Sequence, residues 1–271
     1  MQISATIVTY KNSHEMLNKA ISSFLNTEMD VKLYIVDNSP TDEIKTLCND
    51  SRIEYIFNNA NVGFGAGHNV IMCQPHKMGE YHIVLNPDIY FDGGVIEELF
   101  NYMHDNCSVG LVMPDVYYPD GERQYLPKLL PYISDLIYRR FNISNKIRDK
   151  RNHLYEMRFA DYNNPFQIAI ASGCFSFFRK SVIVNENILY DDRFFMYFED
   201  FDISRRVSVN HKIVCNPNVN VVHEYERGSH KNSKLFKVFV KSLMLYFTKW
   251  GWLFDKRRGE INKYLIEKYS L

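Results

Sequence analysis

The chain has 271 residues, of which 46% are hydrophobic and 24% are charged, so it can bury a substantial core as one large α/β domain, with or without a C-terminal appendage. This composition excludes a disordered or fibrous chain. Lys plus Arg and Asp plus Glu are balanced at 32 each, yet acids gather near 37–43 and 199–202, whereas 139–151 and the region beyond 227 are basic.

The cysteines and the first residues bear on the compartment. The five cysteines are scattered, which argues against a disulfide framework and a zinc site and favours a reducing cytoplasm. They are Cys48, Cys73, Cys107, Cys174 and Cys215. Residues 3–9 follow Met1 without a basic segment, so we expect them to form a first strand and not a signal peptide. No apolar run is long enough to span a bilayer.

The first hundred residues alternate between strand and helix patterns. Residues 3–10 are rich in β-branched side chains, 14–26 carry apolar residues at helical spacing, and 31–36 form a short apolar run that ends at Asp37. A helix-like segment at 42–49, a strand at 53–56, a helix from about 66 to 77 and a strand at 81–85 follow. This alternation favours a parallel sheet covered by helices, in which ligands collect at the carboxyl ends of the strands.

Polar residues follow each of these predicted strands. Tyr10 follows the first strand, Asp37 and Asn38 the second, residues 58–61 the third, and Asn86-Pro87-Asp88 the fourth. The side chains of Asp37 and Asn38 can accept from and donate to the edge of a base. Taken singly, such residues are more often helix caps or turn residues. Their recurrence at four strand ends favours a binding site.

A glycine-rich loop at 61–67 precedes the second predicted helix. Gly63, Gly65 and Gly67 let the backbone approach a phosphate at a helix N-terminus, which favours anions. A nicotinamide site is not expected, because it needs G-x-G-x-x-G after the first strand, whereas this loop reads G-x-G-x-G after the third. The carboxylate of Asp88 beside this loop suits a hard divalent ion that bridges two phosphates, since such ions take few protein ligands.

An acidic and aromatic run spans Phe194–Asp202. Glu199, Asp200 and Asp202 interrupt its aromatic residues, and apolar walls raise the pKa of a carboxyl group and exclude water. A general base is commonly housed in this way. The alternative is a core strand or loop whose acids face solvent.

Two further segments carry basic residues. Residues 121–165 contain an apolar, aromatic stretch at 129–141 followed by basic side chains, which indicates an acceptor-side insertion. Residues 234–252 have apolar side chains at helical spacing with accompanying lysines, a pattern that suits an anionic membrane surface. The alternative is a helix that packs on the domain and leaves its lysines in water. Nucleic-acid binding is not expected, because the phenylalanines of this helix lie at the spacing of buried residues.

The order of these motifs resembles that of family 2 glycosyltransferases, which have the GT-A fold. The matching segments are Ile7–Tyr10, Val36–Ser39, Asn61–Asn69, Leu85–Asp88, Ala171–Gly173, Phe194–Asp202 and His223. The match runs from residue 3 to about 230 and is most similar to a bacterial rhamnosyltransferase-like branch, in which the metal-binding D-x-D appears as N-P-D.

The resemblance implies an α/β fold with a mainly parallel, Rossmann-like GT-A sheet flanked by helices and a C-terminal amphipathic helical appendage. The catalytic domain would span 1–230, with a nucleotide-sugar-binding half at 1–115 and an acceptor-binding half at 116–230 that contains the insertion. Residues 231–271 would form the basic helical region.

The resemblance also assigns roles to residues. Asp200 would be the catalytic base with Glu199 beside it, and Asp88 and His223 would hold Mg²⁺ or Mn²⁺. Donor-binding residues would be Thr9, Tyr10, Asp37, Asn38, Asn61, Gly63, Gly65, Asn69, Asn86 and Arg227. Acceptor-binding residues would be Ser172, Gly173, Tyr197 and Phe198.

The implied function is inverting, metal-dependent transfer of a sugar to a glycan in bacterial O-antigen, capsule or surface polysaccharide synthesis. The expected donor is dTDP-rhamnose, with UDP-galactofuranose or a UDP-hexose as alternatives. The alternative to an enzyme is a non-catalytic protein that binds glycans or nucleotide sugars. The expected partners are the nucleotide-diphosphate sugar, a glycan or lipid-linked glycan acceptor, the inner face of the cytoplasmic membrane at 231–271, and a second copy of the chain in a homodimer.

Overall fold

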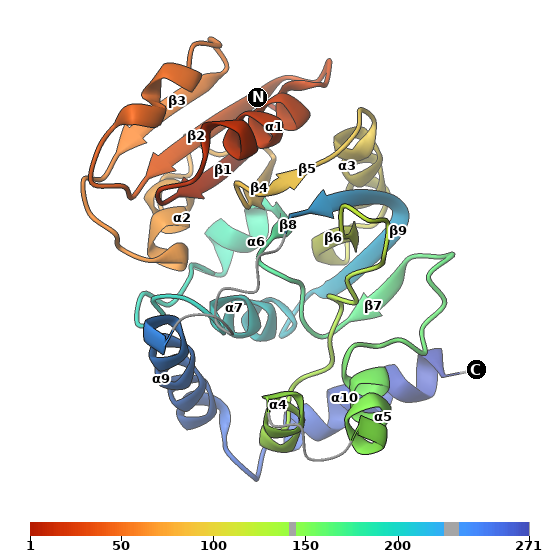
Figure 1. Ribbon diagram of the computed structural model, residues 1–271. Coiled ribbons are helices and arrows are strands. Elements are labelled where there is room, and N and C mark those ends of the chain that lie inside the picture. Colours follow the sequence, from red (N-terminus) through yellow and green to blue (C-terminus); the bar gives the residue numbers. More distant parts are fainter. Residues whose placement is uncertain (141–144, 225–232, 271) are drawn as a thin grey trace.

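A computed structural model describes residues 1–140, 145–224 and 233–270 (Figure 1). The elements of the N-terminal half are β1 (Ile3–Thr9), α1 (His14–Leu25), β2 (Val31–Asp37), the 3-10 helix η1 (Glu43–Leu47), β3 (Ile53–Phe57), α2 (Phe64–Met72), β4 (Tyr81–Leu85), β5 (Ile89–Tyr90), α3 (Val95–Asp105) and β6 (Val109–Tyr117). Those that follow are α4 (Ile133–Arg140), α5 (Asn145–Tyr155), β7 (Phe166–Ile168), β8 (Phe175–Arg179), α6 (Lys180–Asn185), α7 (Glu199–Val207), β9 (Lys212–His223), α9 (Ser233–Trp250) and α10 (Lys256–Tyr269).

One mixed sheet runs through the molecule in the order β3-β2-β1-β4-β8-β6-β9-β5, and β7 pairs with β9. The β3-β2-β1-β4 half is parallel, as the alternating pattern predicts. The second half departs from this prediction, because β8 is antiparallel to both β4 and β6. The predicted α/β class, with flanking helices and C-terminal helices, is confirmed.

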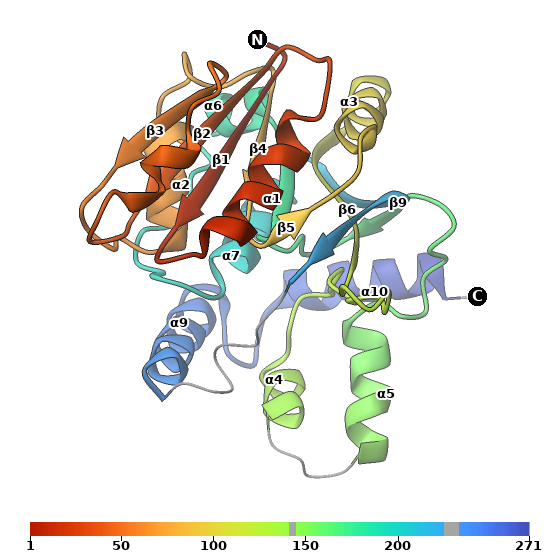
Figure 2. The same cartoon turned by 45° about the horizontal axis from the view of Figure 1, so that its top comes forward.

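The strand order explains where a ligand crevice lies. From β1 the chain crosses through α1 to β2 on one side, and from β3 it returns through α2 to β4 on the other. Because such crossovers are right-handed, α1 and α2 cover opposite faces of the sheet, as Figure 2 shows. The direction reverses between β1 and β4, and a ligand crevice is expected at the carboxyl ends of the strands at such a point.

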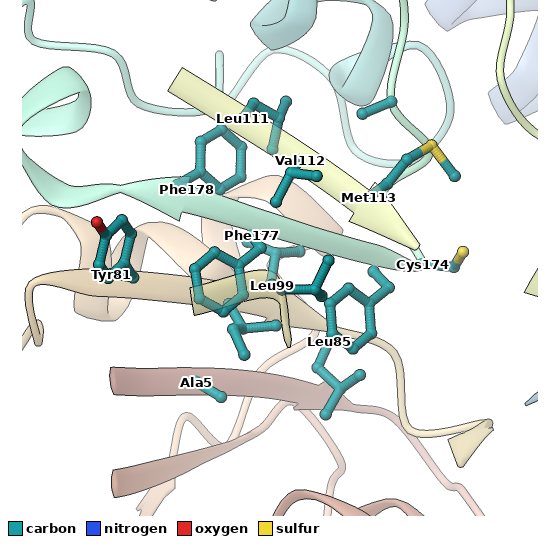
Figure 3. Close-up of a cluster of buried hydrophobic side chains, with 14 of the residues drawn as sticks. Ala5, Tyr81, Leu85, Leu99, Leu111, Val112, Met113, Cys174, Phe177 and Phe178 are labelled. Carbon is teal, nitrogen blue, oxygen red and sulfur yellow. The ribbon is translucent and has the colours of Figure 1, made fainter. Parts of the chain in front are cut away.

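The core lies around the central strands. Figure 3 shows Phe177 and Phe178 of β8 between the side chains of β4 and β6, with Ala5, Tyr81, Leu85 and Val112 close by. The rings of Tyr81 and Phe177 have centroids 5.3 Å apart, a separation that favours aromatic contact. β4 is buried at all five positions, which is typical of a strand covered on both faces. The sheet therefore holds the strand ends rigidly.

The second helix differs from its predicted bounds of about 66 to 77. It begins at Phe64, after Gly63 with φ +94°, and ends at Met72. Pro75 explains the early end, because proline disfavours helical conformation in the residue before it and cannot donate to a helical hydrogen bond. The two glycines inside the first turn therefore belong to the helix and not to a loop.

The C-terminal helices pack on the domain. Phe194 and Phe198 from the acidic and aromatic run are buried against Tyr246 and Phe247 of α9 in a cluster separate from the main core. Arg205 of α7 forms an ion pair with Asp255 at 2.6 Å, and both side chains are almost completely buried. The apolar face of α9 therefore packs on the domain, and the membrane contact predicted for 231–271 stays a prediction. None of the described helices is long and apolar enough to cross a bilayer.

Candidate active site

The ends of β1 and β2 form a compact polar network. Thr9 and Asp37 are paired in register, and Thr9 Oγ1 donates to Asp37 Oδ1 at 3.1 Å. The Ser39 N–H donates to the same oxygen at 2.9 Å, and the Tyr55 hydroxyl donates to Oδ2 at 2.7 Å. Asp37 is fully buried, so these bonds compensate its desolvation. Thr9, Asp37 and Asn38 are all at most 2% exposed, so their contacts with a donor stay predictions.

Asn38 connects this network to the glycine loop. Its side-chain Nδ2 donates to the carbonyl of Gly63 at 3.2 Å, and its Oδ1 accepts from Asn58 Nδ2 at 2.8 Å. Asn61 Oδ1 accepts from the Gly63 N–H at 3.2 Å. Tyr10, at the end of β1, is 46% exposed and available to a ligand. The structure thus brings the predicted donor residues of three strand ends to one edge of the sheet.

The glycines of the loop have a packing reason that the sequence did not reveal. A Cβ at Gly63 would collide with the carbonyl oxygen of Phe195, and one at Gly65 would lie 2.7 Å from Tyr190 Cβ. The Phe64 N–H donates to the Phe195 carbonyl at 2.9 Å. These positions let the loop approach the segment before α7, so their glycines are explained without a phosphate.

Asn69 also contacts that segment. Its Nδ2 donates to the Tyr190 carbonyl at 2.8 Å and to Asp192 Oδ1 at 2.7 Å, and its Oδ1 accepts from the Tyr190 N–H at 3.0 Å. All of its amide groups are therefore engaged within the protein, and its donor contact stays a prediction. His68 is fully buried, and burial holds its pKa well below the ordinary histidine value.

The candidate metal residues meet because β5 pairs with β9. Ile89 lies opposite His223 in the antiparallel register, which places the preceding residue, Asp88, beside the histidine ring. Asp88 Oδ2 lies 3.3 Å from His223 Nε2. The Glu224 N–H donates to the Asp88 carbonyl at 3.0 Å and closes this contact. Two residues 135 positions apart are thus held side by side by backbone pairing.

Gln124 sets the tautomer of that histidine. Gln124 Nε2 donates to the backbone carbonyls of His223 at 2.8 Å and Tyr117 at 3.3 Å, which identifies Oε1 as the acceptor. Oε1 lies 3.0 Å from His223 Nδ1, so Nδ1 carries the proton and the lone pair of Nε2 is directed towards Asp88. Orientation of a histidine ligand by an outer partner is common at metal sites.

These residues fit a divalent cation. Asp88 Oδ1 is buried and has no hydrogen-bond partner among the described residues, and a carboxylate facing an imidazole lone pair is stabilised by a cation between them. No cluster of three or more His, Cys, Asp or Glu side chains is arranged for a metal in the described part of the chain. Asp88 and His223 would therefore hold the ion together with oxygens of a bound diphosphate.

Asp200 lies at the start of α7, where two backbone amides fix its carboxylate. The Gly173 N–H donates to Oδ2 at 3.3 Å and the Phe201 N–H donates to Oδ1 at 3.0 Å. Next to Gly173, the carbonyl of Cys174 accepts from the Asn86 N–H at 2.9 Å. The strand-end segment that carries Asp88 is therefore joined through 173–174 to Asp200.

Glu199 and Asp200 form an acidic pair in a largely apolar setting. Burial, followed by repulsion from Asp200, raises the pKa of Glu199. Burial also raises the pKa of Asp200, and the ammonium group of Lys128 opposes this rise. Glu199 Oε2 is buried with no hydrogen-bond partner in the described ranges. A carboxyl group with a raised pKa beside an ionised neighbour is suited to proton transfer near neutral pH.

Lys128 is a site residue that sequence reasoning missed. Its backbone forms an isolated bridge with Ile170, in which the Ile170 N–H donates to the Lys128 carbonyl at 3.1 Å. This bridge places Lys128 alongside the segment that leads to Ser172 and Gly173. Burial lowers the pKa of Lys128, as does Arg139, while Asp200 and Glu156 raise it. No local signal marks this lysine, because its position depends on a bridge to a residue 42 positions later.

The two aromatic residues predicted to contact an acceptor differ in exposure. Tyr197 and Phe198 have φ values of +72° and +69°, which are outliers for bulky residues and impose local strain. Phe198 is only 3% exposed and contacts Phe201 and Tyr246, so its burial argues against the predicted acceptor contact. Tyr197 is half-buried and Ser172 is half-buried, so both can meet a ligand.

The remaining acid and arginines have structural contacts. Asp202 is fully buried and accepts from Arg206 Nε at 3.0 Å, Trp250 Nε1 at 2.8 Å and Lys249 Nζ at 2.7 Å. These contacts support a structural role for Arg206 and link α7 to α9. Arg227, predicted to meet the donor, lies outside the described residues.

The α/β fold is the GT-A fold of glycosyltransferases. The chain belongs to glycosyl transferase family 2, whose family model matches residues 4–185. It is 24% identical over 219 residues to the low-salt glycan biosynthesis hexosyltransferase Agl10 of Haloferax volcanii; the match covers 77% of this chain and 63% of that protein, so this chain spans less than two thirds of its relative.

Two solved structures with the same fold can be compared with this chain. The chain is similar to residues 1–349 of TarS from S. aureus, with a TM-score of 0.57 and 13% identity over 92% of this chain and 72% of that one. It is also similar to GalNAc-T7 solved with UDP, GalNAc and Mn²⁺, with a TM-score of 0.62 and 16% identity over 90% of this chain and 48% of that one. The likeness supports the GT-A fold.

Proposed function

We propose that the protein is an inverting, divalent-metal-dependent hexosyltransferase that uses a nucleoside-diphosphate sugar. The observation that carries the proposal is the backbone connection from Asn86 through Cys174 and Gly173 to Asp200. It joins the segment that carries Asp88 to the segment that holds the carboxylate of Asp200, the candidate general base. A transferase needs this combination, because one group must stabilise the leaving diphosphate while another accepts a proton from the attacking hydroxyl.

Residues at the ends of the strands would bind the donor. Asp37 and Asn38 would bind the base, and Asp88 and His223 would hold Mg²⁺ or Mn²⁺. When bound, the ion neutralises the charge that develops on the diphosphate. The GalNAc-T7 structure holds UDP and Mn²⁺, which supports this assignment by fold likeness.

Asp200 would activate the acceptor. Its two backbone amide bonds orient the carboxylate, and it would accept the proton of an acceptor hydroxyl as that oxygen attacks the anomeric carbon. A general base contributes about 10²–10⁴-fold to such a reaction. A single displacement by one activated hydroxyl inverts the configuration at the anomeric carbon. Ser172, Gly173 and Tyr197 would position the acceptor.

The proposal extends to the identity of the donor and of the acceptor. The relative from Haloferax volcanii supports a hexose as the transferred sugar. The expectation of dTDP-rhamnose stays a prediction, with UDP-hexose and UDP-galactofuranose as alternatives. The acceptor would be a glycan or lipid-linked glycan of a bacterial surface polysaccharide.

The five free cysteines favour a reducing compartment, which supports the cytoplasm as the place of reaction. The homodimer expected from the sequence stays a prediction.

A donor panel tests the proposal. Purified protein is titrated with dTDP-rhamnose, UDP-hexoses and UDP-galactofuranose, with and without Mg²⁺ or Mn²⁺, and scored by thermal shift and by release of the nucleoside diphosphate. We expect metal-dependent stabilisation and turnover with one donor class. Asp88→Asn should lose both, whereas Asp105→Asn, an exposed residue on α3, should keep both. Binding without turnover on any acceptor would indicate a binding module, and no binding at all would overturn the central proposal.

A further inference from the structure

The loop between α9 and α10 exposes apolar side chains in a row. Trp252 is 40% exposed, Leu253 72% and Phe254 95%. Large apolar residues are normally buried, and adjacent exposed ones mark a contact surface more often than scattered ones do. We call Trp252, Leu253 and Phe254 the apolar tip. Figure 1 shows this connection at the end of the molecule opposite β1, β2 and β3.

The backbone of the apolar tip is held in place from inside. Arg258 is 1% exposed, and its Nη2 donates to the carbonyls of Trp252 at 3.3 Å and Leu253 at 3.2 Å. Gly251 has φ +101°, and a Cβ there would lie 2.7 Å from the Phe254 carbonyl. The turn therefore requires glycine and a buried arginine. The exposure of Leu253 and Phe254 is the product of an ordered turn and does not result from fraying.

Basic side chains flank the apolar tip. Lys256 lies two positions after Phe254, and its side chain is 90% exposed and 3.7 Å from the carboxylate of Glu260. On the outer face of α9, Lys237 and Lys241 are exposed at helical spacing with Val240 and Met244, which are 36% and 54% exposed. An apolar, basic surface of this kind is complementary to anionic lipid headgroups over acyl chains.

A groove of about 890 Å³ continues the same surface. It lies between α5 and α10 and is lined by apolar side chains such as Ile147, Leu154 and Ile266. Its charged lining consists of basic residues 146, 150, 151 and 263 and acidic residues 135 and 267. Arg258 connects it to the apolar tip, because its guanidinium also lies over the ring of Tyr132, 4.6 Å from the centroid, and Tyr132 lines the groove. In Figures 1 and 2 the two helices and the tip lie on the same side of the sheet's second half.

We propose that this surface seats on an anionic lipid bilayer, with Leu253 and Phe254 inserted among the acyl chains and Lys237, Lys241 and Lys256 on the headgroups. A bilayer fits this surface because its most exposed apolar side chains stand at a tip beside lysines, which matches acyl chains that lie beneath anionic headgroups. The proposal does not depend on the transferase reaction, since lipid binding is measured without substrate.

Vesicle co-sedimentation of the full chain is the first test. We expect the protein to bind mixed phosphatidylcholine and phosphatidylglycerol vesicles. The partition coefficient should fall roughly tenfold or more in Leu253→Ser/Phe254→Ser, because the two apolar side chains that insert among the acyl chains are lost. The matched control is Val184→Ser/Val209→Ser, which changes two residues that are 40% and 53% exposed on the catalytic domain and should bind like the wild type. Lys237→Glu/Lys241→Glu should lose the preference for phosphatidylglycerol.

Tryptophan fluorescence gives an independent readout of depth. The chain has two tryptophans, and Trp250 donates its Nε1–H to buried Asp202, so in Trp250→Phe the emission reports Trp252 alone. We expect a blue shift on vesicle addition and quenching by brominated acyl chains. Equal vesicle binding by wild type and the tip variant, or emission unchanged by brominated lipid, overturns the proposal. A loss of self-association in the tip variant with unchanged vesicle binding would instead identify an interface between copies.

Discussion

The N–H of Gly173 donates to Asp200 Oδ2, and a Cβ at Gly173 would lie 3.5 Å from the Cβ of Asp200 and 3.3 Å from Phe64. The glycine thus lets the backbone come close enough to hold the carboxylate from the side of the strand ends. Asp200 is oriented by the backbone, so its direction does not depend on the rotamer of a neighbouring side chain. Asp200→Asn keeps the shape of the side chain but only one of its two acceptor oxygens, so one of the two backbone N–H bonds is lost.

Asp200→Asn should lower kcat by about 10²–10⁴-fold, because the amide cannot accept the proton of the acceptor hydroxyl. Donor binding should persist, since no proposed donor contact involves this side chain. Steady-state rates and a donor titration by thermal shift check the two parts separately. Full activity in Asp200→Asn would remove Asp200 from its proposed role, and loss of donor binding would place it on the donor side.

Lys128→Met should shift the acid limb of the pH profile of kcat/KM to higher pH. The ammonium group of Lys128 favours the ionised form of Asp200, so its removal raises the pKa of that carboxyl group further above the ordinary aspartate value. The base then ionises only at a higher pH, and activity on the acid side is lost. Lys128→Arg keeps the charge and should keep the limb in place. An unmoved limb in Lys128→Met would mean that the two charges do not interact.

Gln124→Leu should weaken Mn²⁺ binding about 10–100-fold, the usual effect of removing an outer partner of a histidine ligand. The reason is that Gln124 Oε1 holds the proton on Nδ1 of His223. Titration of Mn²⁺ in the presence of UDP measures the affinity, and ¹⁵N shifts of His223 report the tautomer without turnover. Gln124→Glu retains the acceptor and should recover part of the affinity. Gln74→Leu, two residues beyond the C-terminal end of α2, serves as the control.

Glu199→Gln should stabilise the fold more at about pH 9 than at about pH 5. Burial raises the pKa of Glu199 in the folded chain, so the folded state binds more protons than the unfolded state above the ordinary glutamate pKa of about 4.3. The free energy of unfolding therefore falls as the pH rises through this window, and glutamine removes that loss. Urea denaturation at the two pH values measures the difference, with exposed Glu28→Gln as the comparison. An equal change at both pH values would show that Glu199 titrates normally.

Residues with a local pattern could be predicted, and residues placed by distant pairing could not. Asp37 and Asp88 follow apolar strands, so the rule that ligands collect at strand ends finds them from the amino-acid sequence alone. Gln124 has no such mark, because it matters only through the backbone and ring of His223, 99 positions later. The acceptor contact of Phe198 stays a prediction: the ring lies beside an acid, as the sequence shows, and is buried against α9, which comes from a distant part of the chain.

The sheet shows the same limit. The alternating pattern predicts the parallel half correctly, because each strand there is followed by a helix of recognisable period. β8 reverses direction without any change in its apolar character, since a strand buried on both faces looks the same in either direction. Its direction follows from the segment at 170–174 that brings Gly173 to the site.

Gly63 and Phe195 give the site a further property. The carbonyl of Phe195 accepts from Phe64 N–H and blocks any Cβ at Gly63, so the loop expected to hold the donor rests directly on the turn that leads into α7. The same short segment therefore joins the N-terminus of α2 to the residues that precede Glu199 and Asp200. If the loop holds the sugar nucleotide as proposed, this contact would connect donor binding to the position of Asp200.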